Sequence, residues 1–419
     1  MQKAKTVKGT KDLLGNDIVA HEYINKIFKE TCFRFNFEQI STPILEHSEI
    51  FTKSLGLSSD IVSKEMYNFI DQGNDSLVLR PEGTAAVARA IITNSLDQNS
   101  FNKYFYYGPM FRRERPQSGR LRQFHQIGIE YLGLTNFLND LEVILIAERL
   151  LDNIGIRKKL VLEINTLGNV QSRKSYNSAL RKFLEDNENN LSDQSKERLK
   201  KNPLRVLDSK NSKDQELLAN SPDIRQYLDK ESSDFFNNLI NGLKKLQIDF
   251  KVNPFLVRGL DYYNHTAFEY VTKEKKSQNA VLAGGRYDGL VEGLGGPDLA
   301  GVGWAAGIER IILNLDNSTK SSRRIICFFS TNENLDLELL RIVKNTRLHN
   351  MYNLNIISSG SLKKKFSKAN KIGAYGCVVL GEDEWQKKKV LWKNLSTGKQ
   401  ELIDFNNIEV FFNKASLRN

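Results

Sequence analysis

Long apolar runs are absent from this chain of 419 residues, and its first residues carry no apolar segment. No stretch of about 18 consecutive apolar residues occurs, so we expect no membrane-spanning helix. The opening MQKAKTVKGTKDLLGND lacks the apolar core of a secretory signal. Both absences favour a cytoplasmic protein without a membrane anchor.

Cysteine is scarce, and its placement excludes two common stabilising devices. The three cysteines, Cys32, Cys327 and Cys377, lie far apart in the sequence and form no CxxC pair. We therefore expect neither a zinc site nor a disulfide framework, and reduced thiols are the simpler interpretation. From the sequence we assign no metal site to protein ligands.

Negative charge is in deficit, most of all towards the C-terminal end. The formal net charge is +11, and residues 323–419 hold 17 Lys and Arg against 9 Asp and Glu, an excess of +8. A basic terminal domain is typical of proteins that bind a polyanion, most simply nucleic acid. A lysine-rich surface without a partner explains the same excess, and charge alone leaves the two interpretations at even odds.

Apolar spacing and turn residues predict alternating helices and strands in the first part of the chain. We expect helices over residues 17–35 and 139–154, a helix from Ala85 onward that Thr84 caps, and a hairpin over residues 66–79. Residues 37–56 fit a strand, a break at a proline and a helix. A short strand is expected over residues 161–166.

The composition and apolar pattern of the chain change after residue 167 and again after residue 250. Residues 168–250 are polar, with helical patches, and we interpret them as a helical insertion. Strand patterns resume over residues 251–315, and residues 316–322, DNSTKSS, are typical of a linker. Residues 323–419 alternate strand and helix, which predicts a small α/β domain with a parallel-type sheet.

Residues 111–130, FRRERPQSGRLRQFHQIGIE, combine an arginine cluster with two apolar flanks. The flanks predict two antiparallel strands, and the proline and glycine between them predict a loop. Arginines held on a sheet need anionic partners, and the guanidinium fork suits phosphate best. A surface salt-bridge ladder is the alternative, but few acids lie nearby. The cluster comprises Arg112, Arg113, Arg115, Arg120 and Arg122.

Alternation along the second strand places Gln126, Gly128 and Glu130 on one face, where the two polar side chains are candidates for one pocket. Glu82, in RPEGT, stands at a strand-to-helix turn and is able to accept hydrogen bonds from an ammonium group. The alternative for Glu82 is an acid that complements the helix dipole.

Two further segments carry unusual residues. Arg258, in LVRGLDYYNHTAFEY, stands in an apolar strand pattern, so it needs Asp261, Glu269 or a ligand anion as its partner. Small residues in GGRYDGL and GVGWAAGIER permit a flat ligand to approach the backbone, with Arg310 ready to meet a terminal phosphate. Since there is no Walker loop or kinase signature, a nucleotide would bind by another scheme.

Taken in order, these segments resemble the class II aminoacyl-tRNA synthetases, specifically the histidyl-tRNA synthetase family. The opening KGTKDLLGND, the motifs RPEGT, LVRGLDYYNHT, GGRYDGL and GIER, and the arginine-rich segment occur in the family's order. GAYGCVVLGEDEW near the end also matches. The resemblance spans nearly the whole chain.

The resemblance implies an α+β fold with an antiparallel-sheet catalytic domain. That domain would comprise residues 1–167 and 251–315, interrupted by a helical insertion over 168–250, and a linker over 316–322 would lead to an α/β anticodon-binding domain over 323–419. It also implies a homodimer, with residues 43–56 near the subunit interface. The implied reaction joins ATP and histidine into histidyl-adenylate, then passes histidine to the terminal adenosine of its tRNA.

Roles for the phosphate-binding residues follow from the resemblance. Arg112 and Arg258 would hold the α-phosphate of ATP from opposite sides and border the histidine, while Arg310 would bind the γ-phosphate. Mg²⁺ would accompany the phosphates. Gln117, in the loop, would lie near the acceptor end of the tRNA.

The resemblance also assigns the amino-acid pocket. Glu82, Thr84 and Gln126 would take the α-amino group of histidine. Glu130 and Tyr263 would hydrogen-bond the imidazole, and Tyr262 would shape the pocket. A neutral imidazole offers one donor and one acceptor, so a site that satisfies both rejects isosteres lacking them.

One residue departs from the family pattern, and two other functions would explain part of the sequence. Ala300 stands at or near a position where the family usually has proline, which removes a stiff turn. A histidine-binding paralogue that regulates histidine biosynthesis without charging tRNA is the nearest rival, but such proteins tend to lose the motif arginines and the C-terminal domain. A plain RNA-binding module would explain the charge but neither Arg258 nor the tyrosine pair.

Overall fold

The computed structural model describes residues 3–56, 59–96, 102–133, 135–274, 280–316, 324–346 and 352–416. The chain folds into two compact units, residues 1–320 and 321–419. Each unit is described separately below. The linker expected over residues 316–322 lies outside the described residues except at its first position. None of the described helices is long and apolar enough to cross a membrane.

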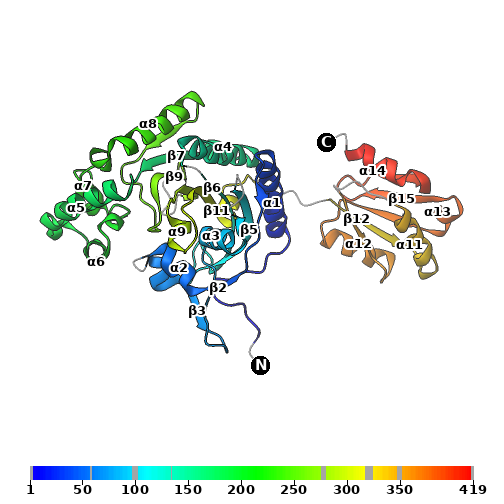
Figure 1. Cartoon of the computed structure of the whole chain (residues 1–419). Coiled ribbons are helices and arrows are strands. Elements are labelled where there is room, and N and C mark those ends of the chain that lie inside the picture. The colour runs from blue at the N-terminus through cyan, green and yellow to red at the C-terminus, as the bar shows by residue number, and fades with distance from the viewer. Residues whose placement is uncertain are drawn as a thin grey trace. The chain divides into compact units, whose positions relative to one another are not determined.

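An eight-stranded sheet forms the centre of the first unit (Figure 1). Its inner strands pair antiparallel, and the described parallel pairs are the two outer ones, β1 with β5 and β7 with β8. The antiparallel sheet expected from the family resemblance is therefore confirmed. The strands follow one another across the sheet as β1 (Glu38–Gln39), β5 (Asn102–Phe111), β6 (Gln123–Gly133), β11 (Ala300–Gly307), β10 (Ala280–Arg286), β9 (Asn264–Thr272), β7 (Leu160–Thr166) and β8 (Phe250–Val252).

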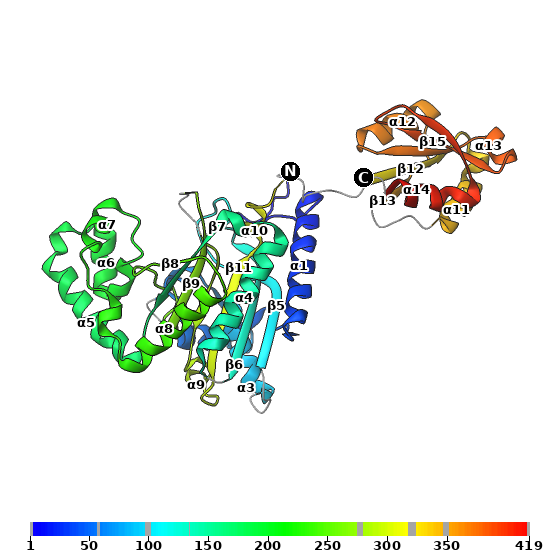
Figure 2. The same ribbon diagram turned by 90° about the horizontal axis from the view of Figure 1, so that it is seen from above.

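Three helices cover one face of this sheet and enclose the main apolar core (Figure 2). They are α1 (Asn16–Arg34), α4 (Phe137–Ile154) and α8 (Lys230–Lys245). The helical spacing of Ile24 and Phe28 turns one stripe of α1 inward, as the sequence predicted. Helix α4 begins where the Asn136 side chain accepts from a backbone N–H and ends at the left-handed Gly155.

The other face of the sheet carries a smaller, tyrosine-rich core. Helices α3 (Thr84–Thr93) and α9 (Leu290–Gly293) pack there against β5 and the tyrosines beside it. Helix α2 (Ser48–Leu55) and a three-stranded sheet of β2 (Leu45–His47), β4 (Ser76–Leu79) and β3 (Tyr67–Ile70) lie beside α3. The predicted hairpin and the predicted strand, break and helix are confirmed.

The polar segment after β7 is helical, as its composition predicted. Helices α5 (Val170–Asp186), α6 (Asp193–Lys201) and α7 (Ser212–Leu218) surround an apolar core of their own, which includes Tyr176 and Leu180. Helix α8 differs, because its apolar side joins the main core beside α4. The boundaries expected for the insertion, 168 and 250, stay a prediction.

The second unit contains a five-stranded sheet in the order β13 (Tyr352–Ile356), β12 (Arg324–Ser330), β14 (Gly376–Leu380), β15 (Lys389–Asn394) and β16 (Gln400–Asp404). The first three strands are parallel, as the alternating pattern predicted. The last two are antiparallel, because they follow β14 as meandering hairpins without an intervening crossover of sufficient length. The described helices are α11 (Asp336–Asn345), α12 (Leu362–Lys371), α13 (Glu382–Gln386) and α14 (Ile408–Ser416).

A buried ion pair joins the sheet to α4. The Arg286 guanidinium bonds the Asp140 carboxylate, and both side chains are 0% exposed. Arg286 also donates hydrogen bonds to Asp288 Oδ1 at 2.9 Å and to the Asn136 carbonyl at 3.1 Å. Burial raises the pKa of Asp140 while Arg286 opposes that shift. The ionic interaction thus offsets part of the cost of removing both charges from water.

We expect Arg286→Met to lower the free energy of unfolding by about 3–5 kcal/mol, because it leaves the buried Asp140 without its partner. Lys200→Met is the matched control, since Lys200 is 66% exposed and its pair with Glu197 lies on the surface. It should cost less than about 1 kcal/mol. Denaturant titration followed by circular dichroism measures both, and equal losses would contradict the assigned role of the buried pair.

Candidate active site

The arginine-rich segment forms the predicted hairpin, with strands β5 and β6 joined by a loop over residues 112–122. Backbone bonds between Gln117 and Arg120 close its tip, where Gly119 has a φ of +73° that favours glycine. Arg112 lies one residue beyond the end of β5, at the start of the loop. Its N–H bonds the Arg122 carbonyl at 2.9 Å, which keeps the two sides of the loop together.

Glu114 partly neutralises this loop. Its carboxylate pairs with Arg120 at 2.7 Å and approaches Arg112 at 3.9 Å. The expectation that the arginines lack nearby acids is therefore wrong for these two. Arg112 also donates from Nε to the Pro81 carbonyl at 2.9 Å, which aims its side chain beside the RPEGT turn.

Arg310 brings a third guanidinium to the same place. It lies on α10 (Ile308–Ile312), donates to the Ala280 carbonyl at 2.8 Å and contacts the Gly119 carbonyl at 3.4 Å. Burial lowers its pKa, and the charges of Arg120 and Arg112 lower it further. Three guanidinium groups in one place repel one another, which favours a bound anion between them.

Glu130 is the centre of the polar pocket and is 1% exposed. Its carboxylate accepts from Tyr287 at 2.5 Å, from Thr84 at 2.7 Å and from Tyr106 at 3.4 Å. Burial raises its pKa from 4.5 to about 8, and the three hydroxyl groups limit that shift. Tyr106 and Tyr287 were not predicted from the sequence. The glycines beside them were the available signal.

Several glycines make room for this carboxylate and its tyrosines. A Cβ on Gly303 would lie 2.2 Å from Glu130 Oε2, and a Cβ on Gly128 would lie 2.4 Å from the Tyr106 hydroxyl. On Gly301 it would lie 2.1 Å from the Tyr287 ring. The small residues predicted to admit a flat ligand therefore admit the protein's own side chains at these positions.

Glu82 is buried just before the first residue of helix α3 and caps the start of that helix. Its two carboxylate oxygens accept from the backbone N–H groups of Thr84 at 2.7 Å and Ala85 at 2.8 Å. The structure therefore corrects the expectation that Thr84 caps this helix, because the Thr84 hydroxyl is directed to Glu130 instead. Burial raises the pKa of Glu82, while these hydrogen bonds and the Arg112 charge oppose the shift.

The structure brings Gln126 into this pocket. It is buried on β6 two positions from Gly128, and its Oε1 has no hydrogen-bond partner among the described residues. A buried carbonyl oxygen without a donor costs free energy, so this atom is prepared to accept from a ligand. Gln126 and Glu130 share one face of β6, as the alternation predicted.

The segment around Arg258 is a loop between β8 and β9, so the strand expected there is wrong. Arg258 pairs with Glu269, one of the two acids proposed from the sequence, and its Nε has no partner in the described structure. Its guanidinium lies 5.1 Å from the Tyr263 ring centre. The Tyr263 ring in turn packs against the Tyr262 ring, with 4.5 Å between the two ring centres.

Tyr262 links the Arg258 loop to the polar pocket around Glu130. Burial first, then Tyr263, Glu82 and Glu130, raises the pKa of the Tyr262 hydroxyl. Gln117, also assigned from the sequence, is exposed at the hairpin tip. Ala300 is the first residue of β11 and pairs with Gly133, so the strand forms without a proline there.

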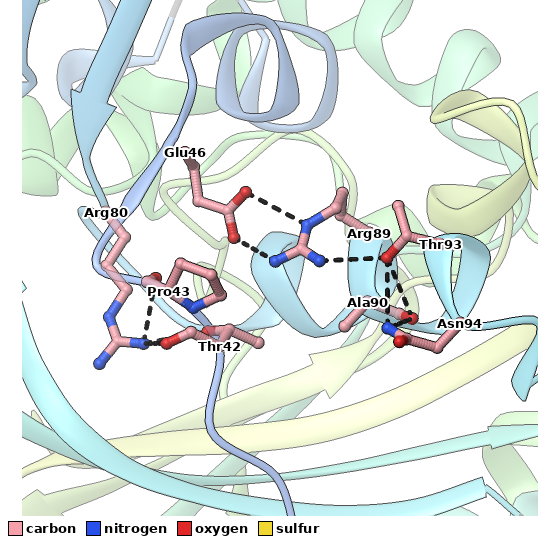
Figure 3. A network of polar contacts seen from close by, with 8 residues as sticks. All are labelled: Thr42, Pro43, Glu46, Arg80, Arg89, Ala90, Thr93 and Asn94. Atoms are coloured by element: carbon pink, nitrogen blue, oxygen red, sulfur yellow. Dashed lines mark hydrogen bonds and ion pairs between the residues drawn. The ribbon is translucent and has the colours of Figure 1, made fainter.

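Arg80 fixes the segment that leads into the pocket (Figure 3). Its Nη1 donates to the Thr42 carbonyl at 2.7 Å and to the Thr42 hydroxyl at 3.0 Å, and its Nε donates to the Pro109 carbonyl at 3.1 Å. Close by, Glu46 pairs with Arg89 on α3. These contacts anchor Arg80, at the start of the RPEGT turn, and helix α3, which follows the turn, so the position of Glu82 depends on them.

Comparisons with known proteins agree with this arrangement. A family model described as "Histidyl-tRNA synthetase" matches residues 9–311, and one described as "Anticodon binding domain" matches residues 325–414. A histidine–tRNA ligase of Rhodospirillum rubrum is 42% identical over 411 residues, 98% of this chain and 99% of its own length. One of Wolbachia pipientis wMel is 43% identical over 399 residues, 95% of this chain and 97% of its own.

A solved structure also matches over nearly the full length. The apo histidyl-tRNA synthetase of S. aureus is 31% identical, with a TM-score of 0.78, and the match covers 98% of this chain and 100% of that one. A Bacillus halodurans structure titled as an ATP phosphoribosyltransferase regulatory subunit/histidyl-tRNA synthetase has a TM-score of 0.65 at 20% identity. That likeness concerns the fold alone.

We expect Gly303→Ala to lower the free energy of unfolding by about 1–3 kcal/mol, because the added methyl group overlaps Glu130 and the Ile129 carbonyl. Gly307→Ala, on the same strand, is the control, since its Cβ would meet nothing closer than 3.9 Å. Thermal and denaturant unfolding measure both variants. A Gly303→Ala protein as stable as the control would show that Glu130 is not tightly confined.

Proposed function

The chain belongs to the histidyl-tRNA synthetase family and is a histidine–tRNA ligase, and on that premise we propose how its residues bind the substrates. The rival interpretations, a regulatory paralogue and a plain RNA-binding module, are set aside, since full-length relatives at 42–43% identity are histidine–tRNA ligases. The proposal depends most on one observation: Glu130 is buried and accepts from three hydroxyl groups, and on the same face of β6 the Oε1 of the buried Gln126 has no hydrogen-bond partner among the described residues.

The guanidinium groups bind ATP. Arg112 and Arg258 hold the α-phosphate from opposite sides, and Arg310 takes the γ-phosphate. The crowding of Arg310 with Arg112 and Arg120 supports this division, because a polyphosphate relieves repulsion among cations. The free Nε of Arg258 supplies one donor that its pair with Glu269 leaves unused.

Mg²⁺ accompanies the phosphates through ATP and water oxygens. In the described part of the chain, no group of three metal-ligating side chains borders these arginines. Two acids near them, Glu114 and Glu269, are engaged in ion pairs. Mg²⁺ commonly keeps several waters and binds through substrate phosphates, which fits such a site.

Histidine occupies the pocket on the other side of the reacting centre. Gln126 Oε1, together with Glu82 and Thr84, accepts the α-ammonium group. Glu130 and Tyr263 hydrogen-bond the imidazole, and Tyr262 closes the pocket. Charge stabilisation and positioning supply the catalysis, with no general base assigned. The attacking carboxylate of histidine displaces pyrophosphate from the α-phosphorus, where Arg112 and Arg258 stabilise the developing charge.

The tRNA contacts both units in this proposal. The exposed Gln117 at the hairpin tip meets the acceptor end, since it projects from the loop that carries Arg112 and Arg120. The basic second unit, with lysines along α12, binds the anticodon part of the tRNA.

We further propose a cytoplasmic homodimer. Exposed apolar side chains gather on β2, β3 and the segment before β2, namely Ile44, Leu45, Phe69 and Ile70. Ile44 and Leu45 belong to residues 43–56, which the family resemblance placed near the subunit interface. Burial of the four side chains against a second copy would remove them from water. The three free, buried cysteines suit a reducing compartment.

Histidine-dependent exchange of pyrophosphate into ATP tests the division of roles. We expect Arg258→Ala to lower the exchange rate by roughly 100- to 1000-fold, because it removes a charge that the transition state needs. Histidine binding, measured by calorimetry, should be largely retained. Arg341→Ala, an exposed position in the second unit, is the control and should exchange normally.

Exchange near the wild-type rate in Arg258→Ala would show that the role of this residue is wrong. Arg258→Lys separates charge from geometry, since it keeps the positive charge but loses the planar fork. A circular dichroism melt of each variant checks that the unpaired Glu269 has not unfolded the loop.

Glu130→Gln should weaken histidine binding by roughly tenfold or more, because a carboxyl oxygen that accepts hydrogen bonds is replaced by an NH₂ group that only donates them. It should also change the pH dependence of stability. Between pH 4.5 and about 8 the folded protein retains a proton that the unfolded chain has lost, so wild-type stability falls as pH rises. The variant lacks that contribution and its stability should fall less.

Denaturant titrations across that pH range measure the difference, with Glu188→Gln, an exposed acid on the insertion, as the matched control. Parallel pH profiles for Glu130→Gln and wild type would mean that the Glu130 carboxylate titrates as in the unfolded chain.

A further inference from the structure

Two histidines and a glutamate meet behind the active-site strand. His21 comes from α1, His125 from β6 and Glu309 from α10, and one ligand atom of each lies within 4.8 Å of the others. His125 Nδ1 is 3.1 Å from Glu309 Oε1, and His21 Nε2 is 4.0 Å from the same oxygen. The two imidazole rings meet edge to face, with 4.9 Å between their centres.

This cluster is separate from the substrate pocket. Successive side chains of a strand point to opposite faces, so His125 points away from the face that carries Gln126 and Glu130. It shares its face with Ile127 and Ile129, which belong to the core beneath α1 and α4. The reaction proposed above uses neither His21 nor His125.

His21 is a polar side chain without adequate partners. It is 2% exposed, and its Nδ1 has no hydrogen-bond partner among the described residues. Its Nε2 lies beyond hydrogen-bond length from Glu309. A buried imidazole left in this state costs free energy, and a ligand bound at Nε2 would recover part of that cost.

We propose that His21, His125 and Glu309 bind one divalent transition-metal ion of the zinc type. Two imidazoles and one carboxylate, with water in the open position, are a ligand set that Zn²⁺ accepts. Ligand atoms around a tetrahedral Zn²⁺ lie roughly 3.4 Å apart. The two separations from Glu309 Oε1, 3.1 and 4.0 Å, bracket that spacing, and all three ligand atoms lie within 4.8 Å of one another, so side-chain rotations would bring them around one ion.

The fold already fixes the carboxylate for this purpose. Glu309 Oε1 and Oε2 accept from the backbone N–H of His125 at 2.9 and 3.1 Å. A backbone donor of this kind orients a metal-binding carboxylate from outside the ligand set. The ion would therefore join α1 to β6 and α10, the elements that carry Gln126 and Arg310, and its role is structural.

Metal binding by the untagged full-length protein, stripped with a chelator and dialysed, tests the site. We expect calorimetry with Zn²⁺ to find one ion per chain, and Co²⁺ to give visible d–d absorption with imidazole coordination. Zn²⁺ should raise the melting temperature, and a chelator should reverse that rise.

His21→Gln should weaken Zn²⁺ binding at least roughly tenfold and abolish the thermal shift, since it removes one of three ligands. His47→Gln is the matched control, because His47 is exposed and outside the cluster, and it should bind as wild type does. Glu309→Gln is a second variant. It keeps an acceptor for the His125 N–H but removes the charged ligand, so it should also lose the ion.

No saturable binding by the wild-type protein would overturn the proposal and leave a hydrogen-bonded group of side chains without metal. Equal Zn²⁺ affinity in His21→Gln and His47→Gln would do the same. Circular dichroism of each variant without metal establishes that a loss of binding is not a loss of folding.

Discussion

The burial of one carboxylate, Glu130, is the constraint on which the active-site half of the structure depends. A carboxylate at the centre of an antiparallel sheet needs hydrogen-bond donors, and the fold supplies three hydroxyl groups. Those hydroxyls belong to bulky tyrosines and to the start of a helix. The neighbouring strands therefore have glycine where a Cβ would occupy the same space. The helix start is in turn held by a second buried acid, Glu82.

The opposite sides of β6 perform different tasks. One side carries the polar pocket, and the other packs into the main core, where His125 interrupts an apolar surface. Because both arise from strict alternation along one strand, a shift of one residue in register would exchange them. The long pairings of β6 with β5 and β11 make such a shift costly.

The sequence predicted much of the site because its signals were local. The hairpin of residues 111–130 and the shared face of Gln126 and Glu130 follow from alternation and turn residues. The expectations that failed involved distant partners. Thr84 looked like a helix cap, but its hydroxyl bonds a residue 46 positions away. Arg258 looked like part of a strand, yet its apolar neighbours line a loop against Tyr263.

Sequence alone therefore determined the inventory of this protein: its strands and helices, its arginines, its acids and the order in which they occur. Only the tertiary structure decided which groups are partners, since Tyr106, Tyr287 and Thr84 reach Glu130 from three separate segments. The same holds for His21, His125 and Glu309. Periodicity reports which side of its own element a residue occupies, whereas the contacts between elements depend on how the sheet and its helices pack.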